Sequence, residues 1–425
     1  MVNIMKICMG NFRNMYITRE IEETVKRISG QFKVLLLTGA RQVGKTTLLK
    51  HLAHGSGRTY VTLDDLAVRS LALSDPALFL QRYTPPLLID EIQYAPQLLS
   101  YIKIYADTEA KNGDIWLTGS QRLPLMQGVT ESLAGRVGII DLQGLTAGEI
   151  NGAEYNAVPF LPTAEQLLRR VKNTDKQSLK EIYKLIWQGS MPALYNGGEQ
   201  DWQSYYASYV QTFLQRDVMK LLPINDEMVF FRFLCAAAGQ TGKMINYAEL
   251  AKAAEVSAPT AKQWIKTLEA AGIIYLLQPF MPPGAKYIVK APKLYFFDTG
   301  LAAYLTRWNN AEALEMGAAS AEFFETWIVA EIYKSYANKG IVPPLYYLRN
   351  FNGKELELII YENGTAYPIA IKKSAHPQKA AKTFAILEPV SADANIKIGE
   401  GGIICFADDL LPAAQDLWYI PAWLV

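Results

Sequence analysis

The sequence has few of the residues that build disulfide frameworks, zinc sites or histidine dyads. Its 425 residues include three cysteines and three histidines. Cys8, Cys235 and Cys405 lie too far apart for metal-ligand spacing. A secreted disulfide framework needs more cysteines than this, so we expect a reducing, cytoplasmic compartment.

An excess of charge and long apolar runs are also missing. The chain has 42 basic and 41 acidic residues, a net charge of +1, so any basic surface must be local. No apolar run reaches the length of a membrane span, so we expect no transmembrane helix. We expect residues 1–17 to be a tail, because Lys6 interrupts their apolar patch and no signal-peptide core is present.

The chain is longer than one hydrophobic core normally supports, so several domains are expected. Residues 18–150 alternate helical patterns with short apolar runs, which we interpret as strands at 34–37, 60–63, 87–90, 115–118 and 137–142. This alternation predicts an α/β core with a parallel sheet covered by helices on both faces. The first helix is expected at 18–30 with Thr18 as N-cap, and a helix at 67–82 is expected to break at Pro76.

Residues 39–46 carry the pattern GxxxxGK[ST] between an expected strand and an expected helix, which predicts a phosphate-binding loop. The glycines let backbone amides turn towards the phosphates, and the helix adds its positive end. Lys45 is expected to reach the β and γ oxygens of ATP, and the Thr46 hydroxyl to ligate Mg²⁺. The predicted nucleotide contacts are Gly39, Ala40, Arg41, Gln42, Val43, Gly44, Lys45, Thr46 and Thr47.

The run PPLLIDE at residues 85–91 predicts a buried strand that ends in two acids. Open α/β sheets bind ligands at the carboxyl ends of their strands. Asp90 is therefore expected to hold Mg²⁺ through its water shell. Glu91 is expected to orient or polarise the attacking water. The alternative is that both acids only cap the next helix.

Polar residues also lie near the next two strands. If the strand at 115–118 lies between the P-loop strand and the Asp90 strand, Thr118 or Ser120 would face the γ-phosphate; an ordinary turn is the alternative. Arg136, just before the fifth strand, would reach a nucleotide in a neighbouring subunit as an arginine finger does, which requires a homo-oligomer. A surface salt bridge is the alternative for Arg136, and the oligomeric state stays open.

Several stretches resemble a bacterial and archaeal family of AAA-type ATPases whose members carry a C-terminal domain of unknown function. They are ARQVGKTTLL, LLIDEIQYAP, WLTGSQ and SLAGRVGIIDLQGLT, and later FLQRDV and PKLYFFDTGLAAYL. The resemblance implies an AAA-type P-loop NTPase core with sheet order 5-1-4-3-2, a helical lid, a winged helix and a nuclease-like tail. It also makes Ser120 similar to the family's sensor residue and Arg136 to its LAGR arginine.

Helical periodicity predominates after residue 150. We expect a helical lid at 151–222 and a winged helix-turn-helix at 223–310, whose helices lie at 247–254 and 259–271 and whose wing strands lie at 273–277 and 287–289. In its second helix the expected buried stripe is Ala261, Trp264, Ile265 and Leu268. The opposite side carries Thr260, Gln263 and Thr267, and Lys262 and Lys266 flank it. The residues predicted to contact double-stranded DNA are Thr260, Lys262, Gln263 and Lys266. Residues 243–293 contain lysines but no arginine, which suits contacts to DNA phosphates more than contacts to bases. The alternative is that the winged helix only packs against a protein partner.

Residues 311–425 return to a mixed pattern typical of a restriction-endonuclease-like domain. An expected helix carries Glu325, and two expected strands carry Glu357 and Lys372. A nuclease of this kind needs an acid two residues before the lysine, so that carboxylates hold Mg²⁺, but Ala370 stands there. We therefore predict an inactive domain that serves binding or assembly.

Three functions follow from these patterns. The favoured one is ATP hydrolysis whose nucleotide state repositions a DNA- or partner-binding half. A nucleotide-gated scaffold without significant turnover is the alternative, and Glu91 argues against it. An ATP-dependent nuclease is the third, and Ala370 argues against that.

Overall fold

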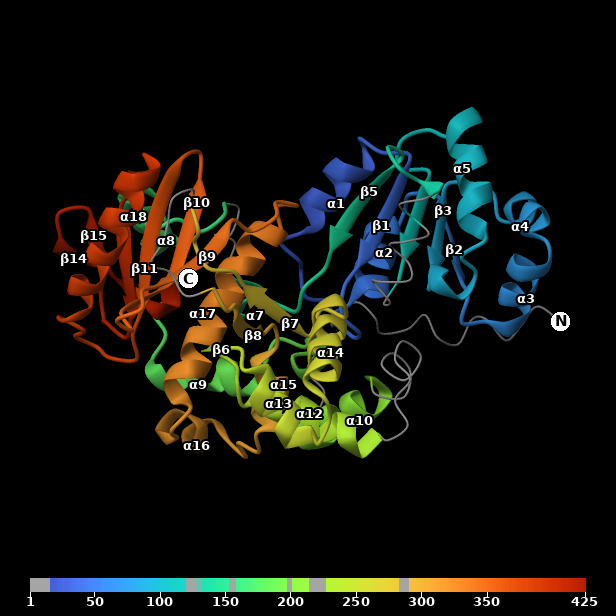
Figure 1. Cartoon of the computed structure of the whole chain (residues 1–425). Helices are drawn as coiled ribbons and strands as arrows, with labels where there is room; N and C mark the ends of the chain where they lie inside the picture. Colours follow the sequence, from blue (N-terminus) through green and yellow to red (C-terminus); the bar gives the residue numbers. More distant parts are fainter. Residues whose placement is uncertain are drawn as a thin grey trace.

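The computed structural model describes residues 16–119, 129, 132–152, 158–196, 201–213, 227–282 and 290–425. Figure 1 shows a blue and cyan N-terminal core, an orange and red C-terminal sheet, and yellow-green helices next to both. Within the described ranges, every helix is too short or too polar to cross a lipid bilayer.

The N-terminal core is built on a five-stranded parallel sheet. Its order is β2-β3-β4-β1-β5, which confirms the order 5-1-4-3-2. The strands are β1 (Val34–Thr38), β2 (Thr59–Thr62), β3 (Leu87–Asp90), β4 (Ile115–Thr118) and β5 (Val137–Asp141). Leu37 lies opposite Thr118, so β1 and β4 end at the same edge of the sheet.

Both faces of this sheet are buried, as its apolar strands predict. Val34 and Leu36 belong to one core cluster, whereas Leu35 and Leu37 belong to another, and each of the four is fully buried. The covering helices are α1 (Glu22–Ser29), α2 (Lys45–Ala53), α3 (Leu66–Ser74), α4 (Pro76–Arg82) and α5 (Leu98–Thr108).

Two of the predicted helix ends in this core can be compared with the structure. The break at Pro76 is confirmed, since α3 ends at Ser74 and α4 begins at Pro76. The prediction of Thr18 as a helix cap is wrong, because Ile21 is the N-cap of α1. The Arg19 backbone amide donates to the Glu22 carboxylate at 3.0 Å, which fixes the preceding turn outside the helix.

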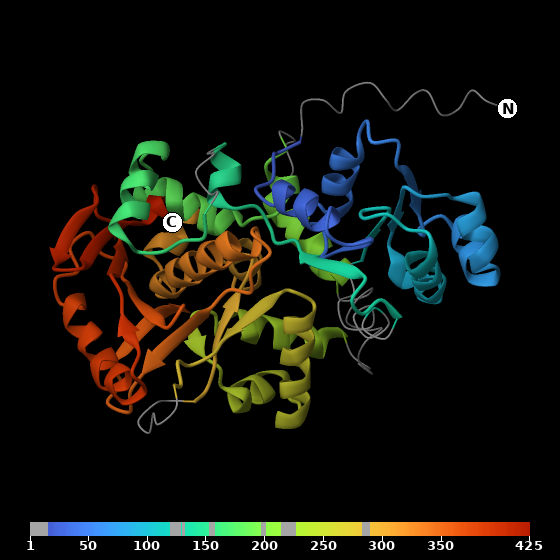
Figure 2. The same cartoon turned by 90° about the horizontal axis from the view of Figure 1, so that it is seen from above.

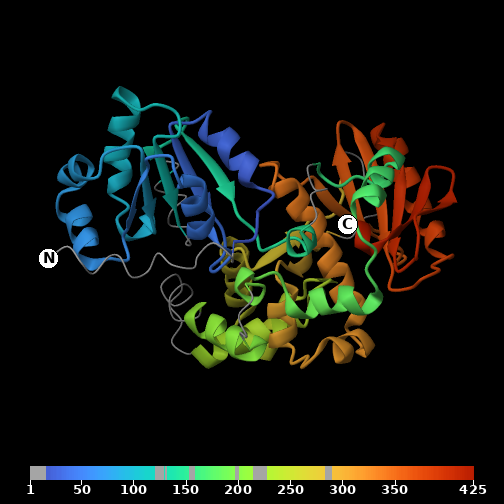
Figure 3. The same cartoon turned by 180° about the vertical axis from the view of Figure 1, so that it is seen from behind.

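The next helices are α7 (Ala147–Asn151), α8 (Ala164–Asn173), α9 (Leu179–Gln188) and α10 (Trp202–Phe213). Helix α9 packs on α15 (Thr299–Leu305), α16 (Ala311–Met316) and α17 (Ser320–Ala337), and α8 packs on the 3-10 turn η6 (Ala422–Leu424). In Figures 2 and 3, the green helices α8 and α9 accordingly lie along the orange and red half of the molecule.

A second helical group contains α12 (Glu227–Ala238), α13 (Tyr247–Ala254) and α14 (Ala258–Ala270). The same segment forms a three-stranded antiparallel sheet of order β6-β8-β7, with β6 (Lys243–Met244), β7 (Ile274–Leu277) and β8 (Lys293–Phe296). Strand β7 thus pairs with β8, and the expected strand at 287–289 lies outside the described residues.

The buried face of α14 is the predicted one, because Ala261, Trp264, Ile265 and Leu268 are all buried. Thr267 contradicts the prediction that it lies on the outer face. It is only 5% exposed, and its hydroxyl donates to the Gln263 carbonyl at 3.2 Å.

The C-terminal part packs α17 beside a larger mixed sheet. Its strand order is β14-β15-β13-β11-β10-β9, and β12 pairs with β11 at one side. The strands are β9 (Leu345–Arg349), β10 (Glu355–Glu362), β11 (Thr365–Ile371), β12 (Lys397–Ile398), β13 (Gly401–Cys405), β14 (Leu411–Ala414) and β15 (Leu417–Pro421).

Removing the Trp264 ring tests the packing of α12–α14. Trp264 lies in T-shaped contact with Phe230 and Phe233, both with ring centroids 5.0 Å away. We expect Trp264→Ala to lower the opening free energy of α12–α14 amides, measured by hydrogen exchange, by about 3–5 kcal/mol. Phe351→Ala is the control, since Phe351 is 67% exposed and should change it by less than about 0.5 kcal/mol.

Candidate functional site

The phosphate-binding loop joins β1 to α2 at the carboxyl edge of the core sheet. Gly44 precedes α2 with φ of 96°, a left-handed conformation that side chains disfavour. Gly39 has φ of 140°, and a Cβ there would lie 2.2 Å from the carbonyl oxygen of Leu142. A glycine is therefore required at both ends of the loop, as the motif predicts.

Lys45 is held against this loop. Its side chain is buried, and its ammonium donates to the carbonyl oxygens of Gly39 at 3.0 Å and Ala40 at 2.7 Å. The ammonium therefore lies inside the curve of the loop, where a phosphate-binding loop places the lysine that pairs with phosphate oxygens.

Asp90 is the meeting point of three hydroxyl groups. Its Oδ1 accepts hydrogen bonds from the Thr46 hydroxyl at 2.7 Å and from the Thr118 hydroxyl, and its Oδ2 accepts one from Tyr60 at 3.0 Å. Asp90 is 5% exposed, because it ends the buried strand β3. The structure thus brings together the end of β3, the start of α2 and the end of β4, as predicted from the sequence.

Glu91 follows Asp90 in a left-handed backbone conformation, with φ of 60° and ψ of 47°. For a residue other than glycine this conformation costs about 1–3 kcal/mol and is concentrated at functional sites. The Glu91 amide donates to the Thr118 hydroxyl at 3.1 Å, and its carboxylate accepts from Gln93. Burial raises the pKa of Glu91, while Gln93 and the Lys45 ammonium oppose the shift.

Thr46 and Asp90 can be tested as holders of a magnesium ion. A hydroxyl oxygen and a carboxylate oxygen, 2.7 Å apart, are the hard ligands that Mg²⁺ prefers, and such sites complete the shell with water and phosphate. These residues fit the ion. Over the described ranges, no cluster of three or more His, Cys, Asp or Glu side chains forms an all-protein metal site.

The remaining predicted residues lie at different distances from this centre. Val43 is buried, whereas Gln42 and Thr47 are exposed, and Arg41 is half-buried. Ser120 lies outside the described residues. Arg136 pairs with Asp107 of α5, with one of its two contacts at 3.1 Å, and so forms the salt bridge that was its alternative.

Three residues of the site were not predicted: Tyr60, Gln93 and Arg19. Gln93 stands two residues after Glu91, and this spacing was the one available signal for it. Tyr60 lies in β2, next to β3, and its position depends on the strand order. Arg19 donates to the Val43 carbonyl at 2.9 Å, although 24 residues separate them in the sequence.

The outer face of α14 carries the side chains predicted to contact DNA. Lys262, Gln263 and Lys266 are exposed, and Thr260 is half-buried. The turn after this helix lies close to the phosphate-binding loop, since a Cβ at Gly272 would lie 3.5 Å from the amide nitrogen of Ala40.

The residues of the predicted inactive nuclease site lie close together, and lysine ammonium groups contact its acids. Lys372 contacts the Glu357 carboxylate, as the pattern predicts. Glu325 accepts from Tyr295 at 2.6 Å and from Lys293, which also donates to Glu355 at 2.6 Å. Burial raises the pKa of Glu325 to about 7, and Lys293 opposes this shift.

Ala370 lies in β11, two residues before Lys372. It is fully buried in an apolar cluster with Ala380, Ile403 and Leu417. The position that a nuclease would fill with a third acid therefore belongs to the hydrophobic core.

Comparison with known families divides the chain into three matched parts. Residues 31–151 match a family described as an AAA domain. Residues 179–312 and 321–425 match two families, each described as a domain of unknown function.

Similar proteins occur in bacteria and archaea. Uncharacterized proteins of Mycobacterium tuberculosis and Mycobacterium bovis are each 27% identical over 361 residues, covering 84% of this chain and 74% of the relative. An uncharacterized protein of Methanocaldococcus jannaschii is 22% identical over 399 residues, covering 86% of this chain and 82% of the relative.

Among solved structures, the Walker-type ATPase of Pyrococcus abyssi is 15% identical with a TM-score of 0.43, over 68% of this chain and 96% of that one. A signal transduction ATPase with numerous domains from Pyrococcus horikoshii is 13% identical with a TM-score of 0.25, over 77% of this chain and 48% of that one. The domain match and the P-loop geometry, not these TM-scores, decide the assignment. Residues 31–151 therefore belong to the AAA-type P-loop family, and domains of unknown function follow them in the chain.

Proposed function

We propose that this chain binds ATP with Mg²⁺ and hydrolyses it, and that the state of the nucleotide repositions the helices beside the P-loop, which bind double-stranded DNA or a protein partner. The observation that carries the proposal is the cluster at the sheet edge, where Asp90 joins Thr46 and Thr118 directly before Glu91. A protein that only holds nucleotide has no need of an acid in a strained conformation at this place.

Each residue has a defined part in the proposed reaction. The backbone amides of the loop and Lys45 bind the phosphates, while Thr46 and Asp90 hold the ion that neutralises phosphate charge. Glu91, whose carboxylate is fixed by Gln93, orients the attacking water and accepts its proton.

Arg136 can serve as a finger only between subunits. It precedes β5 at the amino edge of the sheet, whereas the P-loop follows the carboxyl edge of β1, about 16 Å away for a five-residue strand. Its partner Asp107 is 40% exposed, so the pair can be exchanged for a phosphate on a neighbouring chain. This role predicts a homo-oligomer.

The contacts around the P-loop support coupling between the nucleotide site and the helices that follow the core, α10 and α12–α14. We propose a winged helix in α12–α14 with β7 and a wing, with α14 presenting Lys262, Gln263 and Lys266 to DNA phosphates. A small cavity is lined by Ala40 and Val43 of the loop, Tyr209 of α10, and Gly272 and Ile273 after α14. We propose that α10 acts as the lid over this side of the loop.

Substituting Lys45 of the P-loop and Glu91 after β3 tests turnover. Lys45→Ala should abolish MgATP binding, and Glu91→Gln should retain binding but lower kcat by about 10²- to 10⁴-fold, because proton transfer to the base is lost. Phosphate release and nucleotide binding should be measured with and without duplex DNA. Glu165→Gln, an exposed acid of α8, should match wild type. Tight binding with no turnover in wild type would instead support a nucleotide-gated scaffold.

The pH dependence of kcat tests Glu91 as the base. Burial raises the Glu91 pKa above its ordinary value of 4.5, so its carboxyl stays protonated, and inactive, to a higher pH. Activity should fall as pH decreases through this raised pKa. Gln93→Leu removes a donor that stabilises the carboxylate, so the acidic limb should move further up, whereas the exposed Gln378→Leu should leave it in place. An unmoved limb in Gln93→Leu would contradict the assignment.

The salt dependence of DNA binding tests α14. Lys262→Ala with Lys266→Ala should weaken duplex binding and reduce the slope of log K against log salt by about 2, because two phosphate contacts are lost. Binding can be followed by fluorescence anisotropy at several salt concentrations. Lys379→Ala with Lys382→Ala removes the same charge from exposed positions of the C-terminal part and should have little effect. Equal slopes in both double variants would exclude α14 as the DNA surface.

A further inference from the structure

The loop after β5, residues 142–146, fits directly against the phosphate-binding loop. The Leu142 amide donates to the Thr38 carbonyl at 2.8 Å. The Leu142 carbonyl leaves no room for a Cβ on Gly39, at 2.2 Å. A displacement of this loop therefore displaces the start of the P-loop.

Arg19 ties the two loops together from the other side. Its guanidinium donates to the Val43 carbonyl at 2.9 Å, the Gln143 carbonyl at 2.8 Å and the Gly144 carbonyl at 3.2 Å. It also forms an ion pair with Glu149 at 3.0 Å. Arg19 is 4% exposed, so water does not compete for these contacts.

Glu149 connects Arg19 to the start of α7. Its Oε2 accepts from the Thr146 amide at 2.9 Å, and its own amide donates to the Thr146 hydroxyl at 3.0 Å. Its Oε1 accepts from the Glu20 amide at 2.7 Å. Glu149 therefore fixes the loop after β5 and the segment that carries Arg19 with one carboxylate.

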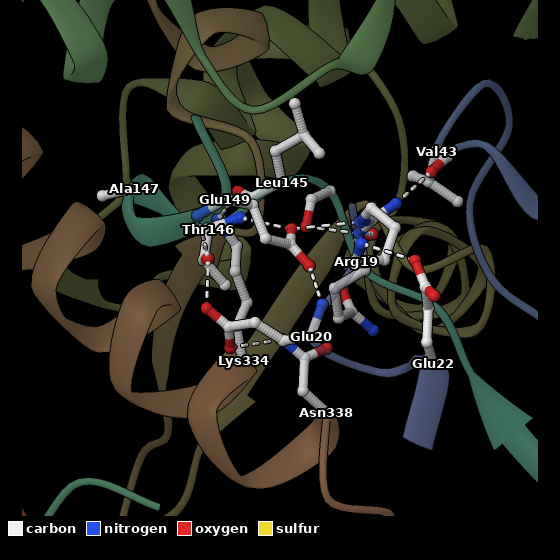
Figure 4. Close-up of polar contacts among 12 residues, drawn as sticks. Arg19, Glu20, Glu22, Val43, Leu145, Thr146, Ala147, Glu149, Lys334 and Asn338 are labelled. Carbon is white, nitrogen blue, oxygen red and sulfur yellow. Dashed lines mark hydrogen bonds and ion pairs between the residues drawn. The ribbon is translucent and has the colours of Figure 1, made fainter. Parts of the chain in front are cut away.

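Helix α17 of the C-terminal part reaches the same loop, as Figure 4 shows. Lys334 donates to the Leu145 carbonyl at 2.7 Å and to Glu331 at 2.7 Å. Glu331 in turn accepts from the Ala147 amide at 2.9 Å. Asn338 donates to Glu20 at 3.2 Å.

We call Arg19, Glu20, Glu149, Glu331 and Lys334 the junction. Four of these side chains are buried, and Glu20 is half-buried. In such surroundings a charge that loses its partner is strongly destabilised. The junction therefore resists gradual deformation, and α17 and the P-loop tend to move as one unit.

We propose that the junction couples the C-terminal part to the nucleotide site, with Arg19 as a positioning residue for the P-loop and Lys334 as the contact by which α17 controls it. The proposal rests on ATP binding as the function of the P-loop. Anything that moves α17 then changes nucleotide affinity, and by linkage nucleotide binding changes the stability of α17 contacts by the same factor.

Helix α17 can transmit such a change because each of its halves makes a polar contact with another part of the chain. Its first half carries Glu325, bonded to Lys293 of β8, and its second half carries Lys334. Nine residues separate them, about 14 Å along a helix. A ligand or partner that shifts β8 or the acids around Glu325 would thus act on the far end of the same helix.

The test compares a cation of the junction with a cation elsewhere in the full-length chain. Lys334→Met removes an ammonium that touches neither a P-loop residue nor a nucleotide contact. It should weaken binding of a fluorescent ATP analogue with Mg²⁺ by about 5- to 150-fold, the usual range of coupling between sites. Arg58→Met is the control: the Arg58 side chain is half-buried and donates to the Gly113 carbonyl at 2.6 Å and to the Asp114 carbonyl at 2.9 Å, just before β4 and away from α17. It should lower the thermal midpoint and leave nucleotide affinity within twofold.

Arg19→Lys tests the positioning role, because it keeps the charge and loses the fork that reaches three carbonyls. We expect KM for ATP to rise more than kcat falls. If substitutions at the junction prevent folding, hydrogen exchange on wild type decides: MgATP should slow exchange at residues 331–338 as well as in the P-loop.

The outcomes separate the two claims. A wild type that binds no MgATP would refute the proposed function. A wild type that binds it, with unchanged affinity in Lys334→Met or with protection confined to the P-loop, would overturn the coupling alone.

Discussion

The N-terminal core depends on one buried carboxylate shared by its neighbours. Asp90 lies at the end of β3 and binds hydroxyl groups from α2, β2 and β4. An isolated carboxylate in such a position would cost several kcal/mol, and the three donors offset this cost. They also fix the ends of β3 and β4, strand β2 and the first turn of α2 relative to one another, which is the geometry that a phosphate-binding site needs.

The sequence was sufficient for this core because its signals are local. Strands β1, β3 and β4 are short apolar runs, and the glycines and Lys45 stand at fixed offsets from one of them. Thr18 was a wrong prediction for a physical reason: Arg19 and Glu20 make distant contacts that hold the chain outside the helix, and capping preference is weak by comparison. Thr267 was assigned to the outer face by its polarity, but a threonine can bury itself by bonding to the preceding turn of its own helix.

The junction could not have been predicted in the same way. The contact between Arg19 and the Gln143 carbonyl spans 124 residues, and that between Lys334 and the Leu145 carbonyl spans 189. Both acceptors are backbone carbonyls, which leave no trace in side-chain patterns. Tyr60 was missed for a related reason, since its partner is defined by the order of strands and not by spacing.

The acidic cluster of the C-terminal part has a consequence for how such a domain can change. Lys293, from β8, lies between Glu325 and Glu355 and forms an ion pair with each of them. Its ammonium therefore provides the positive charge that these acids need. Ala370 belongs to an apolar cluster that includes Ile403 and Leu417. Reintroducing an acid at position 370 would therefore bury a carboxylate among Ile403 and Leu417 without displacing the ammonium. The return of metal-dependent chemistry would require several coordinated substitutions, so the loss of that chemistry is hard to reverse one mutation at a time.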